Sequence, residues 1–126
     1  MNLHITIGTV DDRKSLKSEV AKLGHVTWPV PKNAKMGDSV FFLIPSLTGK
    51  IIAWGTVSSP PTPSESWAPK YAALISKVIF FRKPVPVERL CRELPHWKYF
   101  SYARSYTTVP KQYELQFLAI VSPVKA

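Results

Sequence analysis

The chain has 126 residues, a formal net charge of +9 and a hydrophobic fraction of 45%. This length is that of one ordinary domain, and no apolar run approaches the roughly 20 residues that a membrane-spanning helix needs. The first residues lack the pattern of a signal peptide. With Cys91 as its only cysteine, the chain can form no internal disulfide and lacks the ligands of a cysteine-based zinc site. We therefore expect one soluble, cytoplasmic domain, 1–126, with a linker-like end at 122–126 and without metal or cofactor.

The predicted elements alternate in type along the chain. Residues 3–7 alternate apolar and polar side chains, which predicts a half-buried strand. A helix is expected over residues 11–24, because its apolar residues would share one face and a glycine closes it. Residues 25–38, HVTWPVPKNAKMGD, are expected to be a loop, since proline biases the preceding residue toward extended conformations. The apolar face of the helix would consist of Leu16, Val20 and Leu23.

The second half of the sequence predicts more strands than helices. Residues 110–121 fit both periods, and the proline at their start favours a helix. The order of elements predicts an α+β protein with a mostly antiparallel sheet, curled to make its core, and helices packed around it. The other expected elements are strands at 39–45 and 50–59, a polar loop at 60–71, a strand at 72–85, a short helix at 86–94 and a loop with a short strand at 95–108.

The positive charge is concentrated between residues 70 and 104, where basic residues outnumber acidic ones by eight to two. Such a segment is typical of a surface that binds phosphates, and the aromatic residues within it, including Trp97 and Tyr99, can stack on bases. We therefore expect a nucleic acid as partner and no membrane; the alternative is a solvated basic surface. The residues expected to contact the nucleic-acid backbone are Lys70, Lys77, Arg82, Lys83, Arg89, Lys98 and Arg104.

The order of the motifs resembles that of an EVE domain, a PUA-like β-barrel fold related to YTH domains. The resemblance covers about residues 3–121 and depends on VTWPVP, KMGDSVFFLIP, GKIIAWGTVSS, KYAALISKVIFFRKPVPVERL and SYTTVP, in that order. It implies a curled, mostly antiparallel β-barrel with flanking helices. It also implies a nucleic-acid-binding module that extrudes a modified base into an aromatic pocket. Such modules commonly serve modification-dependent restriction systems, with a fused or associated nuclease or motor subunit.

Carried onto this chain, the resemblance implies that Trp28 and Trp67 form the two walls of an aromatic cage. Stacking contributes about 1–3 kcal/mol per base, which offsets the similar cost of unstacking one nucleotide. The alternative is that Trp28 plugs one end of the barrel and Trp67 fixes the proline-rich loop to the core. Trp54 is either a packing residue or the floor of the pocket. The polar candidates at its lip are Thr9, Asp11, Thr27, Ser105 and Thr107.

Enzyme functions have little support in the sequence. It contains no P-loop, no dinucleotide-binding fingerprint, no G-x-S-x-G and no His–Cys zinc pattern. The histidines are scattered, and Asp38 is expected to cap the turn before its strand. The main prediction is a non-catalytic reader of a modified base, in DNA rather than RNA. The alternatives are an RNA-binding PUA-like module without modified-base specificity and, third, an ASCH-like small amidohydrolase in which Lys32 or Lys35 acts with Asp38.

Overall fold

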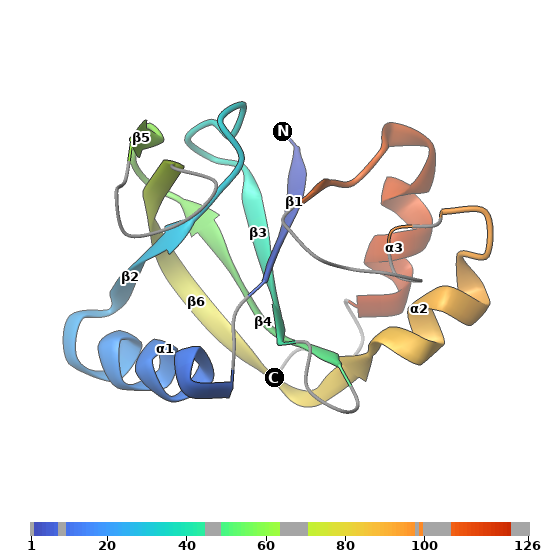
Figure 1. The fold of residues 1–126 in the computed structure, drawn as a ribbon, viewed down its shortest axis with the longest axis horizontal. Coiled ribbons are helices and arrows are strands. Elements are labelled where there is room, and N and C mark those ends of the chain that lie inside the picture. The colour runs from blue at the N-terminus through green and yellow to red at the C-terminus, as the bar shows by residue number, and fades with distance from the viewer. Residues whose placement is uncertain are drawn as a thin grey trace.

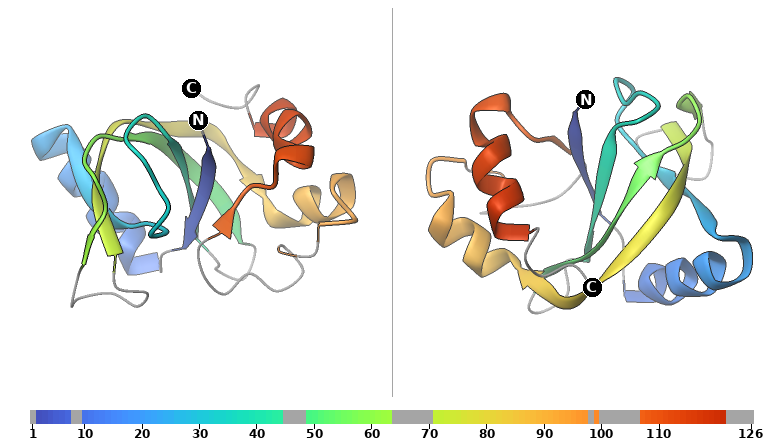
Figure 2. Two further views of the ribbon diagram at one scale, coloured as in Figure 1. Left: turned by 90° about the horizontal axis from the view of Figure 1, so that it is seen from above. Right: turned by 180° about the vertical axis from the view of Figure 1, so that it is seen from behind.

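The computed structural model describes residues 2–7, 10–44, 49–63, 71–97, 99 and 107–121, and the side chains of 10–15 are not described. These residues form a curled seven-stranded sheet flanked by helices (Figures 1 and 2). The elements are β1 (Leu3–Ile7), α1 (Val10–Leu23), β2 (His25–Pro29), β3 (Ser39–Ile44), β4 (Lys50–Val57), β5 (Thr62–Pro63), β6 (Tyr71–Pro86), α2 (Val87–Glu93), β7 (Thr107–Thr108), the 3-10 turn η2 (Lys111–Tyr113) and α3 (Glu114–Val121).

The strands follow the order β2-β6-β4-β3-β1-β7, and β5 pairs with the start of β6. All pairs are antiparallel except β1 with β3, which run parallel. The end strands β2 and β7 are not paired with each other within the described part of the chain, so the sheet is curled rather than closed. The predicted α+β class, with a mostly antiparallel curled sheet and flanking helices, is confirmed.

The central strand β3 is buried along its whole length because the sheet has an apolar core on each face. Val40 and Phe42 pack on the side of α1, and Phe41 packs on the side of α2 and α3, since successive side chains of a strand point to opposite faces. The α1-side core consists of Leu16, Val26, Trp28, Val30, Ala34, Val40, Phe42, Ile44, Ile52, Ala53, Val57, Ala73 and Ile75. The α3-side core consists of Leu3, Ile5, Phe41, Leu43, Ile51, Phe81, Val85, Leu90, Leu94, Val109, Phe117, Ile120 and Val121.

The start of the segment expected to be a loop after α1 is instead a strand. In β2, Trp28 lies opposite Ala73 of β6. Val26 and Trp28 are buried and Thr27 is exposed, which is the period of two that a strand requires. Pro29 is tolerated because it lies at the end of an edge strand, where a missing N–H breaks no ladder.

The helices agree with the sequence except at one residue. α1 ends before Gly24, whose φ of +76° suits the residue after a helix. Leu16 is fully buried, but Leu23 is 61% exposed and does not belong to the apolar face. The final segment is helical, with its buried residues on α3. No helix among the described residues has the length and hydrophobicity to cross a bilayer.

Two short strands lie in segments without a clear pattern. β5 occupies part of the proline-rich run that was expected to be a loop, so that expectation is wrong for Thr62 and Pro63. β7 is the short strand expected between residues 95 and 108, and it pairs with β1. The pairing of β7 places residues from both halves of the chain on the same edge of the sheet.

Two bulges interrupt the regular pairing of the long strand β6 with β4. At the first, Trp54 pairs with Ile79 and Thr56 with Ser76, so β6 contains one extra residue, and Lys77 adopts a φ of +53°. At the second bulge, Ile51 pairs with Val85 and Ala53 pairs with Phe80, so two residue steps along β4 match five residue steps along β6. Bulges bend a strand and increase its twist, which helps the sheet to curl. The exposed basic residues at the two bulges are Lys77, Arg82 and Lys83.

Gly55 lies opposite the first bulge and has no room for a side chain. A Cβ there would lie 2.6 Å from Ile75 Cγ2 and 3.1 Å from the Ser76 carbonyl oxygen. We expect Gly55→Ala to lower the free energy of unfolding by about 1–3 kcal/mol, because the bulge must shift to admit the methyl group. Urea denaturation measures the change, and a midpoint equal to that of the wild type would contradict this close approach.

Candidate nucleic-acid interface

On the α1-side face of the sheet, Trp28 packs against Phe42 of β3. Trp28 is 5% exposed, and its ring meets that of Phe42 edge-on, with centroids 5.2 Å apart and planes at 79°. Thr6 pairs in register with Phe42 and therefore faces the same side of the sheet. Thr6 Oγ1 and Trp28 Nε1 are both buried, and neither has a hydrogen-bond partner within the described part of the chain. Two unsatisfied polar atoms thus lie on the side of the sheet that carries Phe42.

The other described candidates for the base pocket do not join Trp28 on this side. The Thr27 side chain points to the other face of β2 from Val26 and Trp28, and it is exposed. Trp54 lies on the other face of the sheet, where its ring stacks on Phe41 at 6.1 Å and 15°. Thr107 pairs with Ile5, which belongs to the α3-side core. The remaining candidates, Thr9, Trp67, Ser105 and the side chain of Asp11, lie outside the described residues.

A buried polar network connects residues that the sequence analysis treated separately. His4 is fully buried and Asp38 is 4% exposed. His4 Nε2 lies 2.8 Å from Asp38 Oδ2, and His4 Nδ1 lies 3.0 Å from Thr108 Oγ1. The backbone N–H groups of Asn2 and Lys35 each donate to the Asp38 carboxylate at 3.0 Å. The network ties β1, the turn before β3 and β7 together, and the sequence signal for it was a histidine at one of the two polar positions of β1.

Asp38 is therefore a buried acceptor as well as a residue of the turn. Burial alone would raise the pKa of the Asp38 carboxyl, but hydrogen bonds from Asn2, His4 and Lys35 outweigh it and hold this pKa below its usual value. Lys35 contributes its backbone N–H, and Lys32 Nζ lies 5.7 Å from the centre of the Tyr71 ring. Within the described residues, no lysine ammonium pairs with Asp38, so the pair expected of an ASCH-like amidohydrolase is not formed there.

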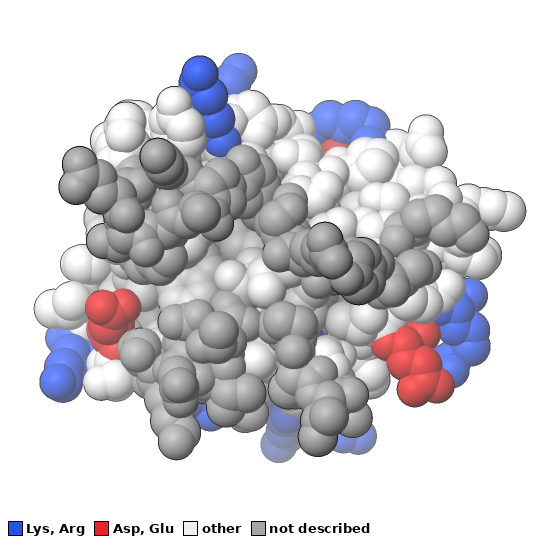
Figure 3. All heavy atoms as spheres, viewed as in Figure 1, with Lys and Arg blue, Asp and Glu red and all other residues white. Residues whose placement is uncertain are grey.

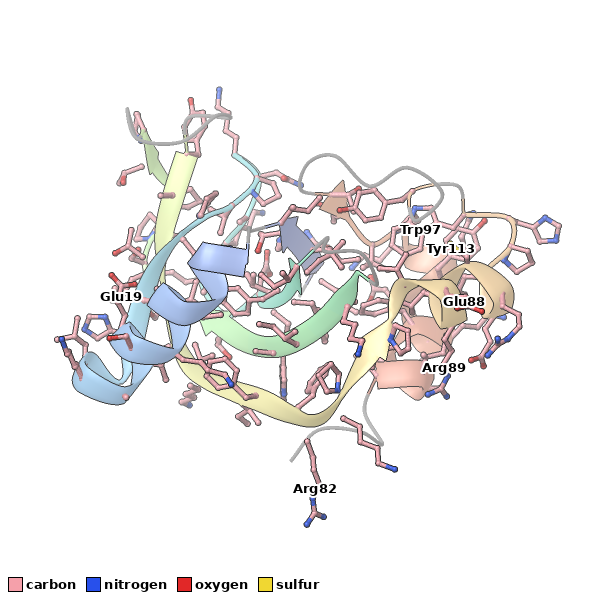
Figure 4. All side chains as sticks on the ribbon, turned by 60° about the horizontal axis from the view of Figure 1, so that its bottom comes forward. Glu19, Arg82, Glu88, Arg89, Trp97 and Tyr113 are labelled. Carbon is pink, nitrogen blue, oxygen red and sulfur yellow. The ribbon has the colours of Figure 1, made fainter. Side chains whose placement is uncertain are left out.

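Aromatic residues after α2 pack against α3. The Trp97 ring stacks with Tyr99 at 5.7 Å and with Tyr113 at 5.6 Å, and it meets Phe117 edge-on (Figure 4). Burial raises the pKa of the Tyr99 phenol above its usual value, which keeps this ring neutral. These contacts give Trp97 and Tyr99 an anchoring role on the α3 side of the molecule.

The basic residues differ in whether an acidic residue neutralises them. On α2, Arg89 Nε lies 2.6 Å from Glu93 Oε2, and before α3, Lys111 Nζ lies 2.9 Å from Glu114 Oε2. The exposed cations of the β6 bulges have no acidic partner within the described part of the chain. Arg82 points away from the sheet in Figure 4. Of the other cations expected to contact phosphate, Lys70, Lys98 and Arg104 lie outside the described residues.

The charged side chains surround one face of the molecule. In the orientation of Figure 1, the Lys, Arg, Asp and Glu side chains of the described residues lie toward the edge of the outline (Figure 3).

The sequence matches neither a family model nor a curated protein sequence. The fold, however, matches solved structures over nearly its full length. A crystal structure of a protein from Pseudomonas putida has a TM-score of 0.71 at 16% identity, covering 94% of this chain and 98% of that one. The human THYN1 protein, in complex with DNA containing 5-methylcytosine, has a TM-score of 0.69 at 10% identity, covering 94% and 96%. The DUF55 domain of human thymocyte nuclear protein 1 has a TM-score of 0.69 at 12% identity, covering 92% and 95%. At these identities the likeness establishes the fold.

Proposed function

We propose that this chain, which has the PUA-like fold of EVE domains, is a non-catalytic module that binds DNA and holds one modified base outside the stack. The observation that carries the proposal is the match of fold, over nearly all of both chains, to a human protein solved with 5-methylcytosine DNA. The module would be the recognition part of a modification-dependent restriction system, with a nuclease or motor subunit fused to it or associated with it.

Trp28 supports a base pocket on the α1-side face. Its ring is held in place by Phe42, so a base that reached it would meet an aromatic group that is already ordered, at little cost in entropy. With 5% of its surface exposed, Trp28 would offer an edge rather than a whole ring face in the free protein. We propose that Trp28 forms the fixed wall of the pocket and that Trp67 supplies the stacking face.

The charge distribution supports an anionic partner of extended shape. The net charge is +9, and the bulges of β6 present cations that no acidic residue neutralises within the described part of the chain. Such cations bind phosphates without regard to sequence. The same cations would serve an RNA-binding module without modified-base specificity, so the preference for a modified base distinguishes the two functions.

Titration with matched oligonucleotides tests the proposal. Single- and double-stranded DNA and RNA, unmodified or with methylcytosine, hydroxymethylcytosine or methyladenine, are added at one salt concentration while tryptophan fluorescence is followed. We expect tighter binding and stronger quenching with one modified DNA. Equal affinity for modified and unmodified oligonucleotides would contradict a base reader and favour the RNA-binding alternative.

We expect Trp28→Phe to weaken binding of the preferred modified DNA about three- to tenfold, because the smaller ring reaches less of the base. Phenylalanine is chosen because Trp28→Ala would empty a buried site and destabilise the fold by about 3–5 kcal/mol. The matched control is Trp97→Phe, which changes the same residue type on the α3 side and should leave affinity unchanged. If both variants lose affinity equally, Trp28 has no special part in the pocket.

A further inference from the structure

The segment between β2 and β3 ends in a tight turn, 35–38, that carries an exposed methionine at its corner. The Asp38 N–H donates to the Lys35 carbonyl at 3.0 Å, which closes the turn. Gly37 has a φ of +93°, the conformation that the third residue of a type II turn requires. Met36 is therefore the second residue of this turn, and it is 61% exposed although its side chain is apolar.

Hydrogen bonds to β1 and β4 fix the turn in place. The Gly37 N–H donates to the Val57 carbonyl at 2.9 Å, and the Val57 N–H donates to the Asp38 carbonyl at 2.8 Å. The Asp38 carboxylate is held in turn by His4, whose Nε2 lies 2.8 Å from Oδ2. Met36 is thus presented on a backbone that is already ordered, so little conformational entropy is lost when its side chain meets a partner.

Two lysines accompany Met36 on the same segment. Lys35 precedes it, Lys32 lies four residues before it, and both are exposed. Neither lysine has an acidic partner within the described part of the chain. The nearest acid in the sequence, Asp38, is buried and faces His4. An apolar tip with free cations beside it is the combination by which proteins wedge open a base step while they hold the phosphates around it.

The turn lies at the end of the sheet where Trp28 lies. Trp28 pairs with Ala73, close to the start of β6, and Ala34 of the same segment packs in the same core as Trp28. In Figure 1 the segment between β2 and β3 projects beyond the sheet at the end that carries β5, which also pairs with the start of β6. A duplex that delivers a base to Trp28 would therefore bring its base stack toward Met36.

We propose that Met36 enters the duplex in place of the extruded base and packs between the two neighbouring bases, while Lys32 and Lys35 contact phosphates on either side. This role rests on the proposed function and adds the group that keeps the duplex open. Extrusion leaves a gap in the stack, and an apolar side chain in that gap offsets part of the cost of unstacking. The partner is double-stranded DNA, because a single strand leaves no fixed gap to fill.

Met36→Ala, Met36→Leu and Leu115→Ala are compared in the full chain by fluorescence anisotropy, with a 5-methylcytosine duplex and with its modified strand alone. Met36→Ala should bind the duplex about five- to tenfold more weakly, because the part of the side chain that is exposed in the free protein no longer becomes buried between bases. It should bind the single strand as the wild type does. Met36→Leu keeps an apolar side chain of similar size and should keep the affinity. Leu115→Ala is the control, because it removes an exposed apolar side chain from α3.

The two lysines are tested through the salt dependence of duplex binding. Each phosphate contact contributes about 0.9 to the slope of log affinity against log salt, so Lys32→Gln with Lys35→Gln should lower the slope by about 1.8. A slope equal to that of the wild type would overturn the part assigned to the lysines.

The outcomes separate the wedge from the proposed function. If the wild type prefers the modified duplex and Met36→Ala retains the full affinity for it, the wedge is overturned and the proposed function stands. Equal losses with the duplex and the single strand also overturn the wedge, because Met36 would then contact the strand itself rather than fill a gap. A wild type that binds modified and unmodified duplexes equally overturns the proposed function and the wedge with it.

Discussion

Asp38→Ala is expected to lower the free energy of unfolding by about 3–5 kcal/mol. The substitution leaves His4 Nε2 and the backbone N–H groups of Asn2 and Lys35 without their acceptor. His4 has no access to solvent, so water cannot replace the lost carboxylate there. Chemical denaturation at pH 7 measures the loss. Glu93→Ala is the control, because it removes a carboxylate from a surface ion pair, which typically contributes less than about 1 kcal/mol.

The dependence of stability on pH gives a second measure of the same carboxylate. Because the pKa of Asp38 is lower in the folded chain than in the unfolded one, its contribution is complete above the unfolded-state pKa of about 4. It is lost as the pH falls below that value and through the folded-state pKa. The difference in the free energy of unfolding between the wild type and Asp38→Ala should therefore shrink as the pH falls into the acid range. If the difference in the free energy of unfolding between the two proteins stayed constant from pH 7 to pH 2, the hydrogen bonds to the Asp38 carboxylate would not stabilise the fold as described.

Replacing Arg82 and Lys83 together by glutamine is expected to weaken DNA binding by roughly one to two orders of magnitude at 0.1 M salt. Each phosphate contact contributes about 0.9 to the slope of log affinity against log salt, so the slope should fall by about 1.8. Both side chains are exposed on the second bulge of β6, and no acidic residue in the described part of the chain competes with phosphate for them. Fluorescence anisotropy over a range of salt concentrations measures both quantities.

The control for this variant removes the same charge from cations that already have acidic partners. Arg89→Gln with Lys111→Gln leaves Glu93 and Glu114 in place, so the net charge changes equally. We expect a clearly smaller loss of affinity, because a phosphate must compete with these acids. Equal losses in the two double variants would show that net charge, rather than the bulges of β6, governs binding.

The helices and the longer strands could be predicted because their signals are local. Gly24 closes α1 through a backbone conformation that glycine adopts at little cost, and Pro110 precedes the turn that leads into α3. β2 was missed because Pro29 dominated the interpretation of its segment. The alternation of Val26, Trp28 and Val30 was nevertheless present, and it is the better indicator of an edge strand.

The candidate site could be predicted only where one residue type stands out. Trp28 was identified because a tryptophan beside prolines is unusual, and the cations of β6 because charge can be counted. The partner of His4, Thr108, is 104 residues away, and no local pattern carries such a pairing.

The position of β1 between β3 and β7 also affects how the protein folds. β1 is synthesised before both of its neighbours in the sheet, which come from residues 39–43 and 107–108. Contacts of such large sequence separation form slowly, because the entropy of closing the intervening chain is lost before they stabilise the fold. At about 5–20 residues per second, β1 waits roughly 5–20 s on the ribosome for β7. A nascent chain therefore leaves the β7 side of β1, and the His4 Nδ1 atom that pairs with Thr108, without their partners during that time.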